Sequence, residues 1–418
     1  MAKIDDSVKK KVPELRFAGF ADDWEQRKLG EVATLSSSKR IHLSDYVTEG
    51  IPFYRGSEIS TGGITGNQEL FISQEKFDEI KEKYGVPSEG DILVTAVGTL
   101  GNLWKVDSRR FYYKDGNLIQ ISKMQVNSDY LLTYFTGGIG KKRLLDSAAG
   151  SNQKALTMVK MREITIDFPS EDEQQKIGSF FKQLDKTIAL HQHKLDLLKE
   201  QKKGYLQKMF PKNGEKVPEL RFAGFADDWE ERKLGDIVVK AIDNRGKTPP
   251  TSENDKYPLL EVASIGGYYP NYSKVTKFVN YNIFNSWFRA HLKKGDILFS
   301  TVGNTGLATL MDDNQDATIA QNIVGFRAKN SNVPEFLLQM FKLPSNLKKA
   351  KRIEMGAVQP SIKVSQLIEV QYLLPKCKHE QEKIGSFFKQ LDDTIALHQH
   401  KLDLLKEQKK GFLQKMFV

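Results

Sequence analysis

The sequence predicts an α/β protein made by internal duplication: two mixed α/β domains separated by two long antiparallel helices, which form a coiled-coil spacer with pseudo-two-fold symmetry. Three observations support this fold class. A block of 19 residues occurs twice, a block of 38 residues occurs twice, and two segments of unlike sequence but common motifs lie between the copies.

Length and composition fit several folded domains. The chain has 418 residues, of which 39% are hydrophobic and 28% charged, so it can build cores and is not disordered overall. A net charge of +10 is compatible with an anionic partner but does not identify one. No uncharged apolar run reaches 18 residues, and the first residues lack the apolar core of a secretory signal, so we expect a cytoplasmic protein without a membrane segment. The single cysteine, Cys377, excludes an internal disulfide and a zinc cluster of cysteines.

Two blocks are repeated almost without change. Residues 12–30 recur at 217–235 with 18 of 19 positions identical, and residues 173–210 recur at 380–417 with 35 of 38 identical. A period near 200 residues is that of whole domains rather than of a solenoid. The predicted boundaries are a first domain over 1–172, a helix over 173–210, a linker and second domain over 211–379, and a helix over 380–418.

The longer block is predicted to be a single helix. Its seam residues alternate in spacings of four and three, from Ile177 to Met209 and again from Ile384 to Met416, which is the heptad pattern of a coiled coil. A helix of this size is roughly 57 Å long. An apolar seam needs a partner, and the nearest candidate is the other copy in the same chain, so we expect an antiparallel pair.

Glycine and histidine residues within the helical block affect this prediction. Gly178 and Gly204 weaken the helix near its ends, and we expect fraying there. His191 and His193 are two residues apart and do not share a helix face, which argues against a metal site. His191 lies on the seam, where a polar residue sets register or is solvated.

The two variable segments, residues 31–172 and 236–379, share a skeleton. GDILVTAVG from Gly90 parallels GDILFSTVG from Gly295, and each apolar run bounded by glycines predicts a buried strand. We infer that the two segments share a fold while their surfaces diverge. Further predicted elements are turns at 62–63 and 266–267, and helices at 74–84, 130–135 and 335–341.

No motif for catalysis is found. The sequence has no phosphate-binding G-x-x-x-x-G-K-[ST] loop, no G-x-G-x-x-G, no Asn-Pro-Pro-Tyr-type stretch and no nucleophile elbow. Residues 79–81, Glu-Ile-Lys, fit a fragment of a nuclease site, but they fall in a helical pattern and lack a preceding acidic motif. We therefore expect neither catalytic residues nor a metal in this chain.

In the order of these duplicated motifs, the chain resembles the DNA specificity subunit of type I restriction-modification enzymes. The resemblance covers nearly the whole chain. The motifs that carry it are Trp-Glu-x-Arg-Lys-Leu-Gly at 24–30 and 229–235, Gly-Asp-Ile-Leu at 90–93 and 295–298, and the Pro to Glu-Gln-x-Lys-Ile segments at 169–177 and 375–384.

The resemblance implies a fold and a function. Two target recognition domains would each read one half of a bipartite, asymmetric site in double-stranded DNA, and the helices would set the spacer. Two modification subunits would dock on the repeated regions and restriction subunits would join them, for adenine methylation or for defence against unmodified foreign DNA. The chain would have no enzyme activity, and S-adenosylmethionine, ATP and magnesium would be bound by the partner subunits.

Base contacts are expected from polar loop residues near the shared skeleton, because Arg and Lys suit guanine while Asn and Gln suit adenine. The candidates are Lys39, Arg40, Arg55, Ser57, Thr95, Asn102, Lys114, Asn152 and Gln153 in the first domain, and Arg245, Lys247, Thr248, Ser264, Tyr268, Thr301, Asn304 and Gln359 in the second. Arg109, Arg110 and residues 141–143 are further candidates for phosphate contacts. The alternative function is a non-DNA coiled-coil scaffold with two ligand-binding domains, which explains divergent segments between invariant blocks less economically.

Overall fold

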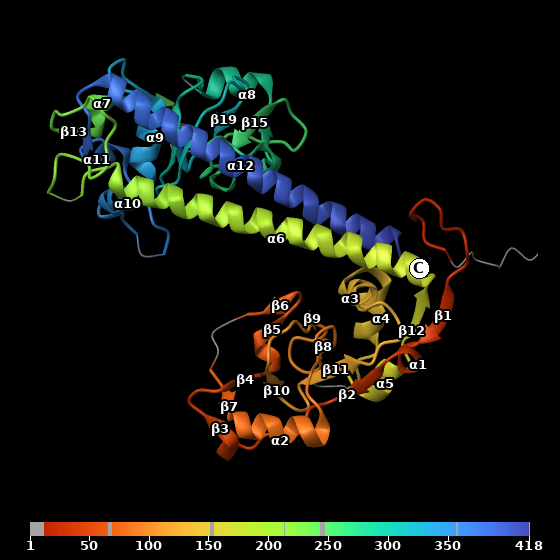
Figure 1. Ribbon diagram of the computed structural model, residues 1–418. Helices are drawn as coiled ribbons and strands as arrows, with labels where there is room; N and C mark the ends of the chain where they lie inside the picture. Colours follow the sequence, from red (N-terminus) through yellow and green to blue (C-terminus); the bar gives the residue numbers. More distant parts are fainter. Residues whose placement is uncertain are drawn as a thin grey trace, which may run out of the picture. The chain divides into compact units, whose positions relative to one another are not determined.

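The computed structural model describes residues 12–65, 69–150, 154–212, 214–242, 247–288, 290–356 and 358–417. Its contacts form two compact units. Unit 1 comprises Met1–Gln192 with Lys401–Val418, and unit 2 comprises His193–His400. Each unit contains one mixed α/β domain, here called domain 1 and domain 2, together with a segment of each long helix (Figure 1). The unit boundaries thus fall inside the long helices, not at the predicted ends of the domains.

The two long helices are continuous and run antiparallel in unit 1. α6 spans Glu171–Lys208 and α12 spans Lys378–Lys415, so each begins two residues before its predicted start. The Phe180 ring centroid lies 5.2 Å from that of Phe412, and further along α6 the Asp185 carboxylate pairs with the Lys409 ammonium at 2.6 Å. Residue numbers therefore rise along α6 while they fall along α12.

The same packing recurs in unit 2, shifted by one repeat. The Tyr205 ring centroid lies 5.0 Å from that of Phe387, and the Lys202 ammonium pairs with the Asp392 carboxylate at 2.7 Å. The residues of the predicted heptad seam are buried or half-buried in both copies. The antiparallel seam is thus confirmed within each unit.

Domain 1 is built on a four-stranded antiparallel sheet in the order β2-β11-β8-β9. A second sheet has the order β10-β4-β7-β3, and β1 pairs with β12. The elements are β1 Glu25–Lys28, α1 Leu29–Val32, β2 Thr34–Ser36, η1 Leu43–Asp45, β3 Tyr46–Val47, β4 Ile51–Tyr54, η2 Gly56–Glu58, β5 Ile59–Ser60, β6 Gly63–Ile64, β7 Phe71–Ile72, α2 Gln74–Tyr84, β8 Ile92–Thr95, β9 Leu103–Lys105, β10 Tyr112–Tyr113, β11 Leu118–Ser122, α3 Ser128–Thr136, α4 Gly138–Asp146, α5 Met158–Arg162 and β12 Thr165–Phe168.

Domain 2 repeats the four-stranded sheet in the order β14-β20-β17-β18, with a three-stranded sheet β16-β15-β19 and the pair β13-β21. Its elements are β13 Glu230–Lys233, α7 Leu234–Ile237, β14 Val238–Ile242, β15 Tyr257–Leu260, η3 Val262–Ser264, η4 Tyr272–Lys274, β16 Phe278–Val279, α8 Tyr281–Trp287, β17 Ile297–Ser300, β18 Ala308–Leu310, β19 Thr318–Ile319, β20 Ile323–Ala328, α9 Pro334–Lys342, α10 Pro344–Lys351, α11 Val364–Leu367 and β21 Gln371–Leu374.

The predicted common skeleton is confirmed. The Gly-Asp-Ile-Leu motifs form β8 and β17, whose residues are all buried. Gly90 and Gly295, which precede these strands, have φ angles of +94° and +86°, a left-handed conformation that favours glycine. The predicted helix at 74–84 is α2: Ser73 caps its N-terminus by accepting a hydrogen bond from the Lys76 amide, and only Phe77 and Ile80 are buried. The predicted helices at 130–135 and 335–341 are α3 and α9.

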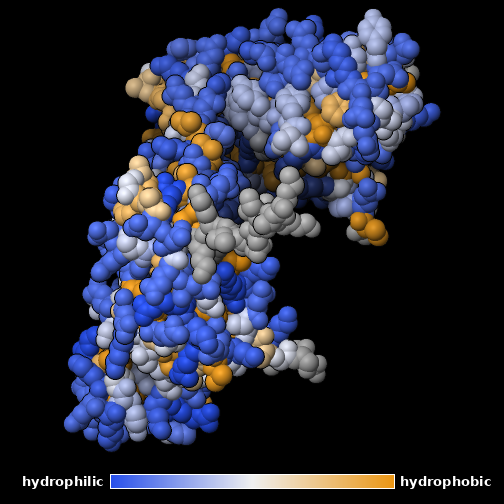
Figure 2. Space-filling model, turned by 90° about the vertical axis from the view of Figure 1, so that its right-hand side faces the viewer, coloured by the Kyte–Doolittle hydropathy of each residue, from blue (hydrophilic) through white to orange (hydrophobic). Residues whose placement is uncertain are grey.

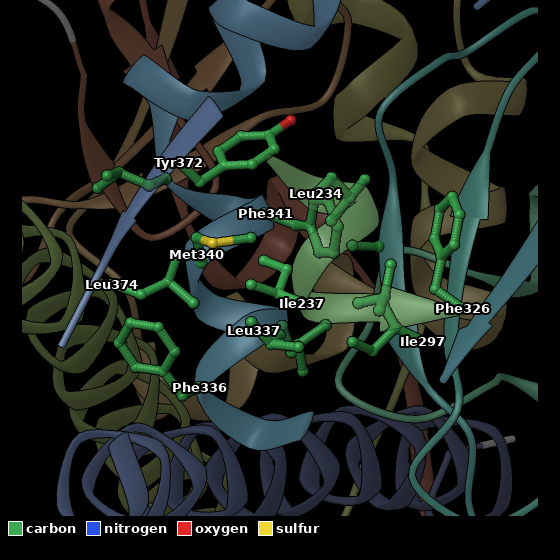
Figure 3. Packing of buried hydrophobic residues seen from close by; sticks show 14 of the residues in the cluster. Leu234, Ile237, Ile297, Phe326, Phe336, Leu337, Met340, Phe341, Tyr372 and Leu374 are labelled. Carbon is green, nitrogen blue, oxygen red and sulfur yellow. The ribbon is translucent and has the colours of Figure 1, made fainter. Parts of the chain in front are cut away.

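Each domain core includes the end of a long helix. Figure 3 shows the core of domain 2, where α9 supplies Phe336 and Phe341 and β21 supplies Tyr372. Phe210, just after α6, joins this core with its ring centroid 5.5 Å from that of Phe336. In unit 1, Phe417, just after α12, packs in the same way against the aromatic residues of domain 1, including Tyr130 at 5.6 Å.

A buried ion pair joins the first repeated block to the start of each long helix. The Arg16 guanidinium donates two hydrogen bonds of 2.7 Å to Glu173, whose side chain is fully buried. Arg221 binds Glu380 in the same bidentate way at 2.7 and 2.9 Å. Hydrogen bonding to Glu380 raises the pKa of the Arg221 guanidinium. The Glu of the repeated Glu-Gln motif thus attaches a domain to its helix.

The neighbouring glutamines have an equally structural role. The Gln174 side chain accepts a hydrogen bond from the Asn127 amide at 3.0 Å and donates one to the Pro169 carbonyl at 2.9 Å. Gln381 makes the corresponding bonds to residues 333 and 375. These bonds fix the beginning of α3 or α9 against the long helix, a function that the sequence motif alone did not indicate.

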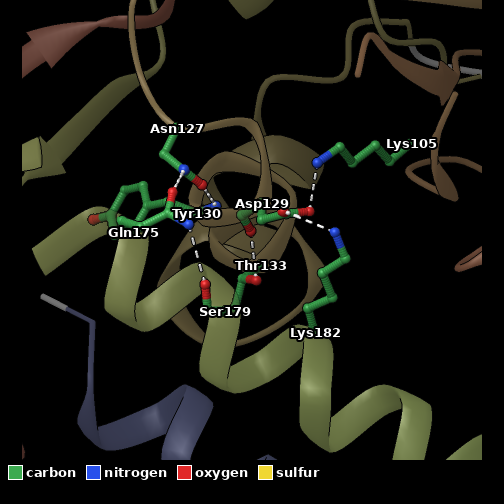
Figure 4. Close-up of polar contacts among 8 residues, drawn as sticks. All are labelled: Lys105, Asn127, Asp129, Tyr130, Thr133, Gln175, Ser179 and Lys182. Carbon is green, nitrogen blue, oxygen red and sulfur yellow. Dashed lines mark hydrogen bonds and ion pairs between the residues drawn. The ribbon is translucent and has the colours of Figure 1, made fainter. Parts of the chain in front are cut away.

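Gly178 permits close contact between α6 and the start of α3. Figure 4 shows this junction, where Asp129 pairs with Lys105 at 2.6 Å and with Lys182 at 3.5 Å. A Cβ atom at Gly178 would lie 2.9 Å from the Asp129 Cβ and the Tyr130 amide, so only glycine fits. α6 runs unbroken through both glycines, and at Gly204 a Cβ would meet no atom within 4 Å.

The two glycines should therefore respond in opposite ways to substitution by alanine. Gly178→Ala should lower the free energy of unfolding by about 1–3 kcal/mol, because the added methyl group overpacks the junction. Gly204→Ala should raise it by up to about 1 kcal/mol, because alanine is the better helix former and the site is open. Urea unfolding followed by circular dichroism measures both changes, and equal effects of the two substitutions would contradict the assigned contact.

Candidate nucleic-acid interface

Several loops of domain 1 meet at one end of its main sheet. Thr95, the last residue of β8, pairs with Leu118, the first residue of β11, and β2 ends at Ser36 opposite Gln120. The loops after β2, after β8 and before β11 must therefore emerge together. We call them, with adjoining segments, the loop end of domain 1; it comprises residues 37–40, 55–58, 96–102, 114–117, 149–150 and 154–155.

Domain 2 has an equivalent loop end. Ser300 at the end of β17 pairs with Ile323 at the start of β20, and β14 ends nearby at residue 242. The residues bridged at Met355 and Ser361 lie against this end, because the Gly303 amide donates a hydrogen bond of 2.9 Å to the Pro360 carbonyl. The loop end of domain 2 comprises residues 261–264, 301–306, 320–322, 355–356 and 358–361.

One hydrogen-bond pattern supports both loop ends. The Thr95 hydroxyl donates to the Thr99 carbonyl and accepts from the Asn102 amide. Ser300 repeats both bonds, donating to the carbonyl of residue 304 and accepting from the amide of residue 307. The loops of the two domains thus begin from the same hydrogen-bonded strand ends but carry different side chains.

The most basic part of the loop end in domain 1 surrounds Asp115. The Arg40 guanidinium pairs with this carboxylate at 2.9 Å and the Lys114 ammonium lies 3.6 Å from it. The Lys39 amide donates to the Tyr112 hydroxyl at 2.6 Å, and the Lys39 ammonium lies over the Tyr84 ring. Two cations around one carboxylate leave a surplus of positive charge. Because the Arg40 side chain is 71% exposed, its ion pair is weak and its guanidinium is able to bind a phosphate instead.

Two other candidates in domain 1 are engaged within the protein. Arg55 pairs with both Glu58 and Glu69 at 2.7 Å, and hydrogen bonding to Glu58 raises its pKa. The Asn102 side chain donates to the Ile59 carbonyl at 3.1 Å. Ser57, between these residues, is exposed at the loop end.

Four candidate base contacts need correction. Thr95, Ser264 and Thr301 are 1%, 2% and 7% exposed, and their hydroxyls bond to carbonyls of the same domain, so these side chains support the loops and offer no surface to a base. Tyr268 lies away from the loop end, with the Lys389 ammonium of α12 5.9 Å from its ring. We remove all four from the set of expected contacts.

The exposed candidates in domain 2 are Lys247, Thr248, Asn304 and Gln359, of which Asn304 and Gln359 belong to its loop end. Asn152, Gln153 and Arg245 lie outside the described residues and remain predictions. Two of the candidates for phosphate contact are paired within the protein. Arg143 is half-buried and binds Asp167 at 2.9 Å, whereas Arg109 pairs with Asp107 on the surface.

Among the described residues, no group of three or more His, Cys, Asp or Glu side chains is arranged to hold a metal ion. Within the same ranges, none of the helices combines the length and apolar character needed to cross a membrane. On the face seen in Figure 2, hydrophobic residues form separate patches in a mostly hydrophilic surface.

Comparison with known proteins gives one consistent result. The family model for the type I restriction modification DNA specificity domain matches residues 21–200 and 226–407, once in each half. The type I restriction enzyme MjaVIII specificity subunit of Methanocaldococcus jannaschii is 21% identical over 402 residues, which cover 94% of this chain and 91% of that protein.

Two further likenesses agree with this match. A putative type I restriction enzyme specificity subunit of Haemophilus influenzae is 31% identical over 166 residues, or 39% of this chain and 40% of that protein. The crystal structure of a type I restriction-modification S subunit from M. genitalium superposes with a TM-score of 0.66 at 14% identity, covering 97% of this chain and 99% of that one. The structural likeness establishes the shared fold.

Substitutions of Gln359 and Lys247 should affect DNA binding in different ways if domain 2 binds DNA through its exposed candidates. Gln359→Ala should cost about 1–3 kcal/mol at one base pair of the site, because a glutamine amide reads a base edge. Lys247→Ala should weaken binding equally on all sequences. It should also reduce the slope of the logarithm of the binding constant against the logarithm of salt concentration by about one, as loss of a phosphate contact does. Competition binding to randomised duplexes at several salt concentrations separates these outcomes; unaltered sequence preference in the Gln359 variant would remove it from the readout.

Proposed function

The chain belongs to the type I restriction-modification DNA specificity family, and from this membership we propose that it selects the DNA sequence on which a type I complex acts. Each domain reads one half of a bipartite, asymmetric site through its loop end, and the long helices set the spacer between the half-sites. The chain performs no chemistry. Adenine methylation and cleavage belong to modification and restriction subunits, which bind S-adenosylmethionine, ATP and magnesium.

The observation that carries this proposal is the contrast between constant frames and divergent loops. The ion pairs of Glu173 and Glu380, and the hydrogen bonds of Thr95 and Ser300, are the same in both halves. At the loop ends the exposed side chains differ: Arg40 and Lys114 occur in domain 1, Asn304 and Gln359 in domain 2. Two domains with the same structural contacts but different exposed loop residues are suited to recognise the two unlike halves of an asymmetric DNA sequence.

Exchange of one reader should alter one half of the recognised sequence. Replacement of residues 31–172 by the corresponding segment of another specificity subunit should change one half-site and leave the other half-site and the spacer unchanged, because the frame around the segment is retained. Methylated motifs read by sequencing of host DNA measure the outcome. A change in both half-sites would contradict the assignment of one reader to each domain, and an absence of any sequence preference would favour the scaffold alternative.

The long helices also present a surface that fits two copies of one partner. Four leucines on them are well exposed: Leu190, Leu197, Leu397 and Leu404, at 65%, 51%, 66% and 50%. Each unit carries two of them outside the buried seam: Leu190 of α6 and Leu404 of α12 in unit 1, and Leu397 of α12 and Leu197 of α6 in unit 2. Large apolar side chains exposed at regular spacing mark interaction sites. Because the two helices carry the same leucines, we assign them as the docking surface for two modification subunits.

Charged substitutions of these outer leucines should release the modification subunits. Leu190→Glu with Leu404→Glu should weaken the docking surface of unit 1, and the four-leucine variant should weaken both surfaces, because a buried carboxylate without a partner is costly. Val159→Glu, at another exposed apolar residue in domain 1, is the matched control. Native mass spectrometry counts the bound subunits. Two subunits held with unchanged affinity by the four-leucine variant would exclude this surface.

A further inference from the structure

Domain 1 contains a polar cleft beside its loop end, with which it shares residues 37–39. The cleft has a volume of about 520 Å³ and lies between the outer face of β2 and β11 and the segment that follows α2. Its lining includes Ser36 and Gln120 from the sheet, Tyr84 at the end of α2, and Tyr113 from β10.

A nearly buried carboxylate forms part of the cleft. Asp91, which is 8% exposed, accepts hydrogen bonds on Oδ2 from the Ser88 amide at 2.9 Å and from the Gln120 side-chain amide at 2.7 Å. The Gln120 amide is held in turn by the Tyr113 hydroxyl, which donates to its oxygen at 3.0 Å. Within the described part of the chain, no cation pairs with Asp91. A carboxylate so enclosed is a strong acceptor for a donor group brought by a ligand.

The equivalent place in domain 2 is filled by the protein itself. Asp296, the counterpart of Asp91, receives two hydrogen bonds of 2.7 Å from the Arg327 guanidinium. Gly325 occupies the position of Gln120, since both pair with the second residue of the Ile-Leu strand, and Ile242 and Leu292 pack over it. One copy of the frame is thus closed by a protein cation and apolar side chains, while the other is open.

The mouth of the cleft has different chemistry from its interior. Lys39 and Lys123, both exposed, are the cations in its lining, and the Lys39 ammonium lies 5.2 Å from the ring centroid of Tyr84. The Tyr84 ring is 60% exposed and offers a flat apolar face. The Ser38 hydroxyl, also in the lining, has no hydrogen-bond partner in the described part of the structure.

We propose that this cleft binds a nucleotide whose base carries an exocyclic amino group. The amino group donates to Asp91 in place of the Arg327 donors of domain 2, the base stacks on Tyr84, and the phosphate binds Lys39 and Lys123. Each part of such a ligand meets the chemistry that suits it: an acceptor inside, a ring at the edge and cations at the mouth. The nucleotide is either free or an unstacked nucleotide of a bound DNA, and binding of the free form does not depend on the proposed function.

Free mononucleotides test the site directly. Titration calorimetry of the full chain should show AMP or CMP binding at least about tenfold more tightly than UMP, which presents a carbonyl in place of the amino group. Lys123→Ala should weaken all the nucleotides that bind, because it removes a phosphate contact from an exposed position where folding is unaffected. Lys160→Ala, an exposed lysine of α5 outside the cleft, should change nothing.

Asp91→Asn should remove the preference for bases that carry an amino group. An unchanged melting temperature of this variant shows that it remains folded despite any change in the contact with Ser88. Duplexes containing 2-aminopurine distinguish the two sources of nucleotide. A fluorescence increase on binding that AMP suppresses indicates a nucleotide of the DNA, whereas mononucleotide binding without that increase indicates a free one. Absence of binding by AMP and CMP, or equal binding of UMP that Asp91→Asn leaves unchanged, would overturn the proposal.

Discussion

A buried arginine–glutamate pair fixes the frame on which everything else in each half depends. Arg16 with Glu173, and Arg221 with Glu380, join the first repeated block to the first turns of a long helix. Both carboxylates are almost completely buried, so neither charge is tolerable without its partner. The glutamine that follows each glutamate then orients α3 or α9, and through them the sheet that carries the loops.

This frame separates the demands of folding from those of recognition. The residues that attach a domain to its helix are duplicated almost without change, and so are the hydrogen bonds that hold the strand ends. The exposed residues at the loop ends take no part in these structural contacts, and they differ between the domains. The same separation accounts for the polar cleft of domain 1, because the pair Asp296–Arg327 shows that the frame is compatible with a filled as well as an open site.

Periodic and local features could be predicted from the sequence, whereas roles that depend on distant partners could not. The heptad seam, the buried Gly-Asp-Ile-Leu strands and α2 follow from spacing and composition, and each is confirmed. Thr95, Ser264 and Thr301 looked like contact residues because a sequence does not reveal which hydroxyls bond to nearby carbonyls. Gly178 looked like a weak point because its neighbour, the start of α3, lies about 50 residues away. The Arg16–Glu173 pair joins residues 157 positions apart, so no local pattern in the sequence indicates it.

The most direct test of this account is a double-mutant cycle on Arg221 and Glu380, measured by urea unfolding of the full chain. Arg221→Ala and Glu380→Ala should each lower the free energy of unfolding of unit 2 by about 3–5 kcal/mol, because each leaves a buried charge unpaired. The double variant should lose little more than either single variant. The exposed pair Lys233–Glu369 in the same domain should show a much smaller coupling, because solvent screens it. Additive losses for Arg221 and Glu380, or a coupling no larger than that of the exposed pair, would contradict the claim that this interaction holds the frame.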